Sequence, residues 1–232
     1  MNSSKKLFKK TLSTQIAELL ESAIQNEEWA VGAKMPSEPE LAEMYGVSRN
    51  TLREAIHYLA ISGLIEVRPG DGTYVRNKTA LDAAIAKCLE KEELKNILEV
   101  RQLIEPDLCA MAALRKTPEE AGKLTELHDI MMESFHERRQ DYLERDIAFH
   151  IQIGVMSHNS LLCDIYNAII GWYPIVFKEG FLSFVENDEK EIYFHTDLLN
   201  AIVKGDAEKA KELTIKMLTQ EGEDFLDLNR FR

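Results

Sequence analysis

The chain has 232 residues, of which 45% are hydrophobic, and a formal net charge of −12 at pH 7. This length and apolar content suit one large or two small domains with hydrophobic cores. No run approaches the roughly 18 apolar residues of a membrane span, so a membrane protein is excluded. No apolar leader follows the N-terminal lysines, and the scattered cysteines (Cys88, Cys109 and Cys163) predict reduced thiols in a cytoplasmic protein.

The N-terminal stretch predicts a basic arm followed by a helix. Residues 5–10 are rich in lysine, and we expect them to be disordered because termini without packing partners order poorly. A first helix is expected over residues 11–26, where the apolar residues on one helical face are Ile16, Leu19, Leu20 and Ile24.

Residues 35–62 predict a helix, a tight turn and a second helix. Ser37 is a favourable N-cap, and Glu40, three residues later, can complete a capping box. Gly46 ends the first helix because it accepts positive φ, and Ser48 caps the second helix. The second helix has one apolar stripe, composed of Leu52, Ala55, Ile56, Leu59 and Ala60. One face of this helix therefore packs, and its other face is left for a partner.

A predicted hairpin follows the second helix. Two β-rich runs, 64–68 and 73–76, flank the turn sequence Pro69-Gly70-Asp71-Gly72. A helix-turn-helix followed by a hairpin is a winged helix, whose second helix enters the DNA major groove N-terminus first. This stretch therefore predicts a sequence-specific contact with double-stranded DNA.

The residue types at the start of the second helix suit that contact. Arginine pairs bidentately with guanine and asparagine with adenine, whereas hydroxyl groups and helix N-termini suit phosphate. Glycine at the wing tip lets the backbone approach the minor groove. The predicted DNA-binding residues are Ser48, Arg49, Asn50, Thr51, Arg53 and Gly70.

Residues 35–75 also resemble the N-terminal domain of the GntR superfamily of bacterial transcription regulators. The resemblance rests on Met35-Pro36-Ser37-Glu38, Leu41-Ala42, Gly46-Val47-Ser48-Arg49, Leu52-Arg53-Glu54-Ala55, Gly63-Leu64-Ile65 and Gly70-Asp71-Gly72-Thr73-Tyr74-Val75. It implies that Arg49 and Arg53 are the main DNA contacts. Pro39 stands where relatives often have a basic residue that touches DNA, so we expect that contact to be absent.

The charge distribution is compatible with DNA binding. Residues 1–76 carry 9 basic and 10 acidic side chains, whereas residues 77–232 carry 19 and 30. The acidic surplus therefore lies outside the predicted DNA-binding domain. Affinity should rest on local positive charge and depend strongly on salt, and a dimer would strengthen it by linking two half-site contacts.

The rest of the chain predicts an all-α antiparallel bundle. A polar joint at residues 77–79 separates a winged helix-turn-helix domain (1–77) from an effector-binding and dimerisation domain (78–232). The expected helices span residues 81–89, 91–115, 118–138, 140–157, 159–178, 187–204 and 206–228. The fold class is therefore mostly α, with a small β-hairpin in the first domain.

A few polar residues interrupt the apolar faces of these helices. Asp146 and His150 are one turn apart, so they can chelate a divalent ion if a facing helix supplies a third ligand. His195 and Arg101 also lie in strongly apolar stretches. Bundles bind ligands between facing helices through such inward polar groups, and Arg101 would suit a carboxylate.

These positions resemble the FCD effector-binding domain of the FadR subfamily of GntR regulators. The resembling stretches include Leu98-Glu99-Val100-Arg101, Phe149-His150, Ser157-His158-Asn159-Ser160 and Gly205-Asp206-Ala207. The resemblance implies a divalent metal (Zn, Ni or Mn) at Asp146, His150 and His195, and a small carboxylate effector bound by these residues and Arg101. Met217 stands where metal-binding relatives have a fourth ligand, a histidine. A metal-free pocket that holds an acidic effector directly therefore remains an alternative.

We interpret the chain as a homodimeric transcription regulator, a repressor of a metabolic operon that reads a palindromic operator. It is not expected to be an enzyme or to bind a membrane. Two alternatives remain: an acyl-CoA or fatty-acid sensor with a cavity near residues 172–184, and a metal-dependent hydrolase that uses Asp146, His150 and His195.

Overall fold

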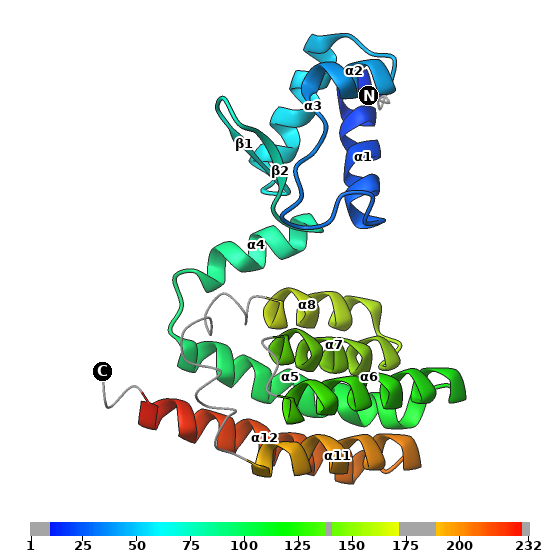
Figure 1. Ribbon diagram of the computed structural model, residues 1–232, viewed down its shortest axis with the longest axis vertical. Helices are drawn as coiled ribbons and strands as arrows, with labels where there is room; N and C mark the ends of the chain where they lie inside the picture. The colour runs from blue at the N-terminus through cyan, green and yellow to red at the C-terminus, as the bar shows by residue number, and fades with distance from the viewer. Residues whose placement is uncertain (1–9, 138–140, 172–188, 229–232) are drawn as a thin grey trace, which may run out of the picture. The chain divides into compact units, whose positions relative to one another are not determined.

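The computed structural model describes residues 10–137, 141–171 and 189–228. The chain forms two compact units, Met1–Lys87 and Cys88–Arg232, which are described separately below. The described part of the first unit combines helices α1–α3 and most of α4 with a β-hairpin, and the described part of the second is helical (Figure 1). The predicted mostly α fold class is confirmed. Among the described helices, none has both the length and the hydrophobicity needed to cross a membrane.

The helix-turn-helix forms as predicted. Helix α1 (Leu12–Gln25) packs against α3 (Arg49–Ile61), and α2 (Glu38–Met44) precedes α3. Their shared core contains Leu20, Leu41, Leu52 and Leu59, each at most 1% exposed. Because the buried residues of α3 all lie on one stripe, its opposite face is left in solvent.

Local side-chain chemistry sets the ends of these helices. The Glu40 carboxylate accepts hydrogen bonds from the Ser37 N–H (2.8 Å) and hydroxyl (2.6 Å). Gly46 has a φ of +64° in the turn, and Ser48 accepts a bond from the Thr51 N–H at 3.2 Å. The turn therefore depends on a glycine and on two capped helix starts.

The wing is an antiparallel hairpin of β1 (Ile65–Arg68) and β2 (Gly72–Val75), with Ile65 opposite Val75. Gly70 takes a φ of +79° at the tip. On its other edge, β2 receives the chain that precedes α2, because the Met35 N–H donates to the Thr73 carbonyl at 2.8 Å. The hairpin is thereby tied to the helix-turn-helix.

Helix α4 (Ala80–Leu89) spans the division between the units, and none of its residues is buried. The second unit contains α5 (Leu94–Arg115), α6 (Pro118–His136), α7 (Tyr142–Met156), α8 (Ser160–Ile170), α11 (Glu189–Lys204) and α12 (Ala207–Leu228). These helices lie within a few residues of the predicted ranges. The exception is the predicted helix 159–178, which was too long, because α8 ends at Ile170 with Gly171 as its C-cap. Residues 172–178 lie outside the described residues.

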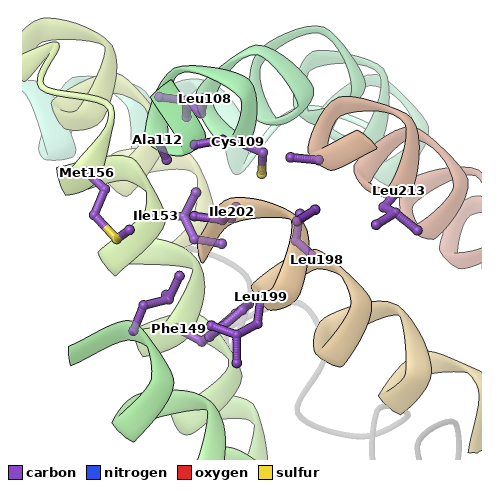
Figure 2. Close-up of a cluster of buried hydrophobic side chains, with 14 of the residues drawn as sticks. Leu108, Cys109, Ala112, Phe149, Ile153, Met156, Leu198, Leu199, Ile202 and Leu213 are labelled. Atoms are coloured by element: carbon purple, nitrogen blue, oxygen red, sulfur yellow. The ribbon is translucent and has the colours of Figure 1, made fainter. Parts of the chain in front are cut away.

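The core of the second unit lies where α5, α7, α11 and α12 meet (Figure 2). Figure 2 labels Leu108, Cys109, Ala112, Phe149, Ile153, Met156, Leu198, Leu199, Ile202 and Leu213. Burial of this set supplies the main stabilisation of the bundle. Three of these helices, α5, α7 and α11, carry the polar residues that the sequence singled out in this unit, Arg101, Asp146, His150 and His195.

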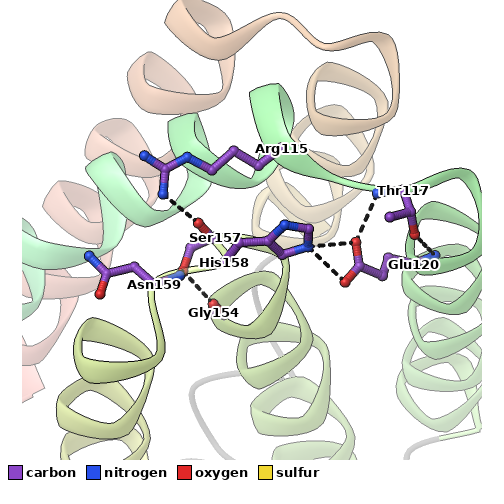
Figure 3. Close-up of polar contacts among 7 residues, drawn as sticks. All are labelled: Arg115, Thr117, Glu120, Gly154, Ser157, His158 and Asn159. Carbon is purple, nitrogen blue, oxygen red and sulfur yellow. Dashed lines mark hydrogen bonds and ion pairs between the residues drawn. The ribbon is translucent and has the colours of Figure 1, made fainter.

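A polar corner joins the starts and ends of four helices (Figure 3). Glu120 accepts a bond from the Thr117 N–H at 2.8 Å, and its carboxylate lies 3.0 Å from Nε2 of His158 in the α7–α8 turn. The Thr117 backbone N–H lowers the pKa of Glu120, with His158 contributing. Arg115 at the end of α5 donates to the Ser157 carbonyl at 2.8 Å. These contacts hold α7 in place relative to α5 and α6.

Candidate functional site

The outer face of α3 carries the predicted base-reading side chains. Arg49, Asn50 and Arg53 are all exposed, on the side opposite the buried stripe. Arg53 Nε lies 3.4 Å from Glu38 Oε2 of α2, but its side chain is still 69% exposed. A surface ion pair of this length is weak, so the guanidinium remains accessible to a ligand.

Ser48 and Thr51 lie at the start of α3, as the phosphate-binding prediction requires. Their hydroxyl oxygens are 2.8 Å apart, and Ser48 also caps the helix. The two hydroxyls therefore stabilise the first turn of α3. They also lie at the N-terminus of the helix, where the helix dipole is positive. Their contact with phosphate stays a prediction.

The wing adds cations that the sequence analysis did not single out. The Arg68 guanidinium lies 4.3 Å from the centroid of the Tyr74 ring, and its Nε is 2.9 Å from Glu66 Oε2. Lys34 and Arg76 lie beside the same strands, close to Asp71 and Glu66 respectively. These wing cations could have been recognised from the sequence, because basic residues lie on both sides of the glycine-rich turn.

In the second unit, Asp146 and His150 of α7 meet His195 of α11. His150 Nε2 lies 3.2 Å from His195 Nε2, and His195 Nε2 lies 3.0 Å from Asp146 Oδ1. The third separation, between His150 Nε2 and Asp146 Oδ1, is 3.7 Å. The three potential ligand atoms therefore converge on one point, although His195 is 45 residues from His150 in sequence.

This arrangement fits a divalent metal ion. Nitrogen and oxygen ligands at about 2.0–2.2 Å from one ion lie roughly 3.0–3.5 Å apart at tetrahedral or octahedral angles. Two of the three separations fall in that range, and the third is slightly longer. Asp146 Oδ1 is buried, and its nearest polar neighbour is His195 Nε2 at 3.0 Å, in a contact that does not satisfy strict hydrogen-bond geometry. An acceptor atom buried in this way is compatible with a cation as its missing partner.

The surroundings of the three residues favour charge on Asp146. Burial alone would raise the pKa of this carboxyl, but His150, His195 and Arg101 outweigh burial and lower it. His150 and His195 are only 3% and 2% exposed. The ring of Phe149 packs edge-on against both imidazoles, with centroids 5.4 and 5.7 Å away, which restricts their orientation.

Arg101 is buried next to this centre, but another residue holds it. Its guanidinium forms an ion pair with Glu105, one turn later on α5. An effector carboxylate that binds Arg101 would therefore have to compete with Glu105 or join it. Burial and the nearby Glu105 raise the pKa of Tyr166 well above its usual value, so this phenol stays protonated beside the centre.

Glu105 and Tyr166 were missed as site residues by the sequence analysis. A carboxylate one turn after Arg101 on an apolar helix was the available signal for Glu105. Met217 is buried on α12, where a thioether offers no strong ligand for zinc or manganese. The aromatic segment 172–184, predicted as a lipid cavity, lies outside the described residues.

A winged helix-turn-helix with an exposed basic recognition helix, joined to a helical domain with a buried polar centre, defines a DNA-binding regulatory protein. Comparison with known families identifies the family of regulators to which the chain belongs. Residues 12–75 match the family described as bacterial regulatory proteins, gntR family, and residues 96–220 match the FCD domain. The chain belongs to the GntR family of bacterial transcription regulators, with an FCD domain as its second part.

Similar proteins agree with this membership. The chain is 31% identical to the transcriptional regulator YieP of Escherichia coli over 212 residues (87% of this chain, 90% of YieP). It is 29% identical to LutR of Bacillus subtilis over 206 residues (84% and 93%) and 27% identical to the E. coli galactonate operon transcriptional repressor over 195 residues (81% and 85%). These relatives are regulators and not enzymes, so the hydrolase alternative is set aside.

A solved structure also resembles the chain. A GntR protein of Streptococcus agalactiae superposes with a TM-score of 0.57 at 25% identity, covering 91% of this chain and 99% of that one. The similarity of fold therefore extends over most of the chain.

Proposed function

We propose that this regulator represses a metabolic operon and responds to a small carboxylate through a divalent ion held by Asp146, His150 and His195. The convergence of their three buried ligand atoms carries this proposal. A bound ion would offer open coordination positions to a carboxylate oxygen. The galactonate operon repressor, whose name refers to a sugar acid, supports both the repressor role and the class of effector.

The protein groups around the centre have separate tasks in this proposal. His150 and His195 supply neutral imidazole nitrogens, and Asp146 supplies a negative charge that offsets part of the ion's charge. Phe149 orients both rings, as supporting residues do in metal sites. Arg101, paired with Glu105, provides a second cation for an acidic ligand.

The DNA-binding part of the proposal uses the exposed face of α3. Arg49, Asn50 and Arg53 would read base edges, and Ser48, Thr51 and Gly70 would approach the backbone. We propose that two copies bind the two halves of a palindromic operator. Effector binding would then lower operator affinity through a coupling free energy between the two sites.

The double variant His150→Ala/His195→Ala tests the effector site. Wild-type protein should contain or take up close to one divalent ion per chain, and Zn²⁺, Ni²⁺ or Mn²⁺ should raise its melting temperature. Ligand at 100 times its Kd stabilises by about 2.7 kcal/mol, which corresponds to several degrees. The double variant should lose the metal, the thermal shift and the response of operator binding to carboxylates. Elemental analysis, thermal shift and mobility shift on an operator selected from random DNA measure these quantities.

The control is His136→Ala, which removes an exposed histidine from α6. It should retain the metal and the response. Effector-free operator binding should be the same in both variants. A double variant that takes up metal and responds to carboxylates like wild type would contradict the assignment.

A further inference from the structure

An ion pair between Arg101 and Glu105 is buried inside the helical unit. The two residues lie one turn apart on α5 and are 3% and 2% exposed. Both Nε and Nη2 of the guanidinium contact the carboxylate, and Nη2 lies 3.4 Å from Oε2. A buried pair of this kind costs desolvation free energy that its own attraction barely offsets, so its contribution to stability is small. A role at the neighbouring centre accounts for the pair better.

Tyr166 of α8 connects this pair to the candidate metal ligands of α7. Its ring packs on α7 at Gly154, about two turns after Asp146, where an added Cβ would lie 3.3 Å from Cδ1 of the ring. Burial raises the pKa of the Tyr166 phenol, Glu105 and Asp146 raise it further, and Arg101 opposes them. Because a charge shifts a pKa mainly at short distance, the phenol lies close to all three charged groups. The pair and the centre therefore form one electrostatic cluster.

The charges of this cluster decide how much negative charge an effector can bring. Asp146 and Glu105 carry one negative charge each, and Arg101 carries one positive charge. Because Glu105 cancels the charge of Arg101, a divalent ion together with Asp146 leaves one positive charge among the described residues. A first carboxylate of the effector neutralises this charge. A second carboxylate would be buried without compensation, which is strongly unfavourable.

We propose that Glu105 is a specificity-determining residue that restricts the effector to acids with a single carboxylate. With glutamate at this position, Arg101 orients the acid through hydrogen bonds but adds no net attraction for a second carboxylate. Without that negative charge, Arg101 would make the centre more positive by one charge and admit dicarboxylates. This inference rests on the proposed function, because it assumes the divalent ion and the acidic ligand, and it adds the charge of that ligand.

The test is Glu105→Gln in the full chain, which removes the charge but keeps the size and an oxygen that accepts a hydrogen bond from Arg101. The probes are two pairs of acids that differ by one carboxylate: gluconate against glucarate, and lactate against tartronate. In calorimetric titrations at saturating Mn²⁺, wild type should bind the monocarboxylate of a pair about tenfold or more tightly than the dicarboxylate. Glu105→Gln should lower this ratio by about tenfold or more, since the charge of Arg101 is no longer cancelled.

Further variants separate the charge of Glu105 from a structural role of the pair. Glu105→Asp keeps the charge and should keep the preference for monocarboxylates. Arg101→Gln/Glu105→Gln removes both charges, so the affinity for both acids should fall while their ratio stays near that of wild type. The matched control is Glu99→Gln, the same substitution on α5 at a side chain that is 60% exposed. It should change neither the affinities nor the ratio.

Metal affinity gives a second measurement that needs no acid. Loss of a negative charge beside the ion should raise the Kd for Mn²⁺ about tenfold in Glu105→Gln. The Kd should stay near that of wild type in Arg101→Gln/Glu105→Gln, because the net charge of the cluster is then unchanged. Competition with a fluorescent chelator measures both constants.

The outcomes separate this inference from the proposed function. A wild-type protein that takes up no divalent ion, or that binds none of these acids when loaded, would remove the proposed function and this inference with it. A wild type that binds the acids without favouring the monocarboxylate, or a Glu105→Gln variant with the wild-type ratio, would overturn only the role of Glu105. An equal change of the ratio in Glu105→Gln and Arg101→Gln/Glu105→Gln would also overturn it, because the effect would then come from packing and not from charge.

Discussion

Arg49 and Arg101 lie in opposite environments, one exposed to solvent and the other buried in an ion pair. Arg49 lies in solvent at the start of α3, where its position depends only on the helix that carries it. Arg101 is 3% exposed and is tied to Glu105 within a buried ion pair. Removal of one partner of a buried pair leaves an uncompensated charge, whereas removal of an exposed arginine affects little besides its ligand.

Arg49→Ala should therefore weaken operator binding without weakening the fold. The expected loss is about 1–3 kcal/mol, or roughly 5- to 150-fold, if Arg49 pairs with a base. Thermal unfolding should match wild type. Mobility shift with the selected operator and with a scrambled duplex gives the ratio of specific to non-specific affinity, which should fall.

Lys123→Ala is the control, because it removes an exposed cation from α6 in the other unit. It should bind both duplexes like wild type. Operator affinity of Arg49→Ala within twofold of wild type would show that Arg49 makes no base contact.

The helices and turns of this chain are set largely by local chemistry. Capping residues open α1, α3, α6 and α8, and in each the N-cap side chain accepts a backbone hydrogen bond. Gly46 connects α2 to α3 with a φ of +64°, a conformation that side chains with a Cβ disfavour. Gly122, by contrast, lies within α6, and a Cβ there would meet no atom within 4 Å.

The two glycines should respond to alanine with opposite signs. Gly46→Ala should lower the free energy of unfolding by about 1 kcal/mol or more through backbone strain. Gly122→Ala should raise it by about 0.5–1 kcal/mol, since alanine is the better helix former. Thermal and urea unfolding of the full-length variants, followed by circular dichroism, measure both changes. Equal effects of the two substitutions would contradict the structural reason given for Gly46.

The chain as an assembled regulator has to bind DNA despite a net charge of −12. The first unit is nearly neutral, so each contact with a half-site is expected to be weak and sensitive to salt. Linking two such contacts in one dimer can raise the affinity by about 10²- to 10⁴-fold without any new contact. The pairing of two copies on one operator, proposed above, would therefore contribute to operator affinity.

An operator with one half replaced by unrelated sequence tests this point. Wild-type affinity should fall by about 100-fold or more, because the second contact is lost. If single copies bound the operator independently, the loss would be only about twofold, the statistical effect of losing one of two equal sites. Fluorescence anisotropy titrations at one fixed salt concentration measure the change. A loss of only about twofold would show that two linked copies do not bind the two half-sites together.

Much of the architecture could be predicted because it depends on neighbours in the sequence. The ends of α2 and α3 were identified by the capping residues Ser37, Glu40 and Ser48 and by Gly46 in the turn. The wing was identified by alternating apolar residues around a glycine-rich turn. The apolar stripe of α3 likewise predicted which of its faces would be buried, although Ala60 proved only half-buried. Caps, turns and periodicity act within a few residues, so they can be recognised without knowing what packs where.

The sequence by itself thus determined the mostly helical fold, the winged helix-turn-helix and the exposed residues at the start of α3. Only the tertiary structure decided that His195 lies 3.2 Å from His150, that Glu105 already holds Arg101 and that one face of α5 stays in solvent. The physical reason is the separation in sequence between the residues that interact. A helix forms from contacts three or four residues apart, whereas ligand geometry and burial depend on which helices meet and at what rotation.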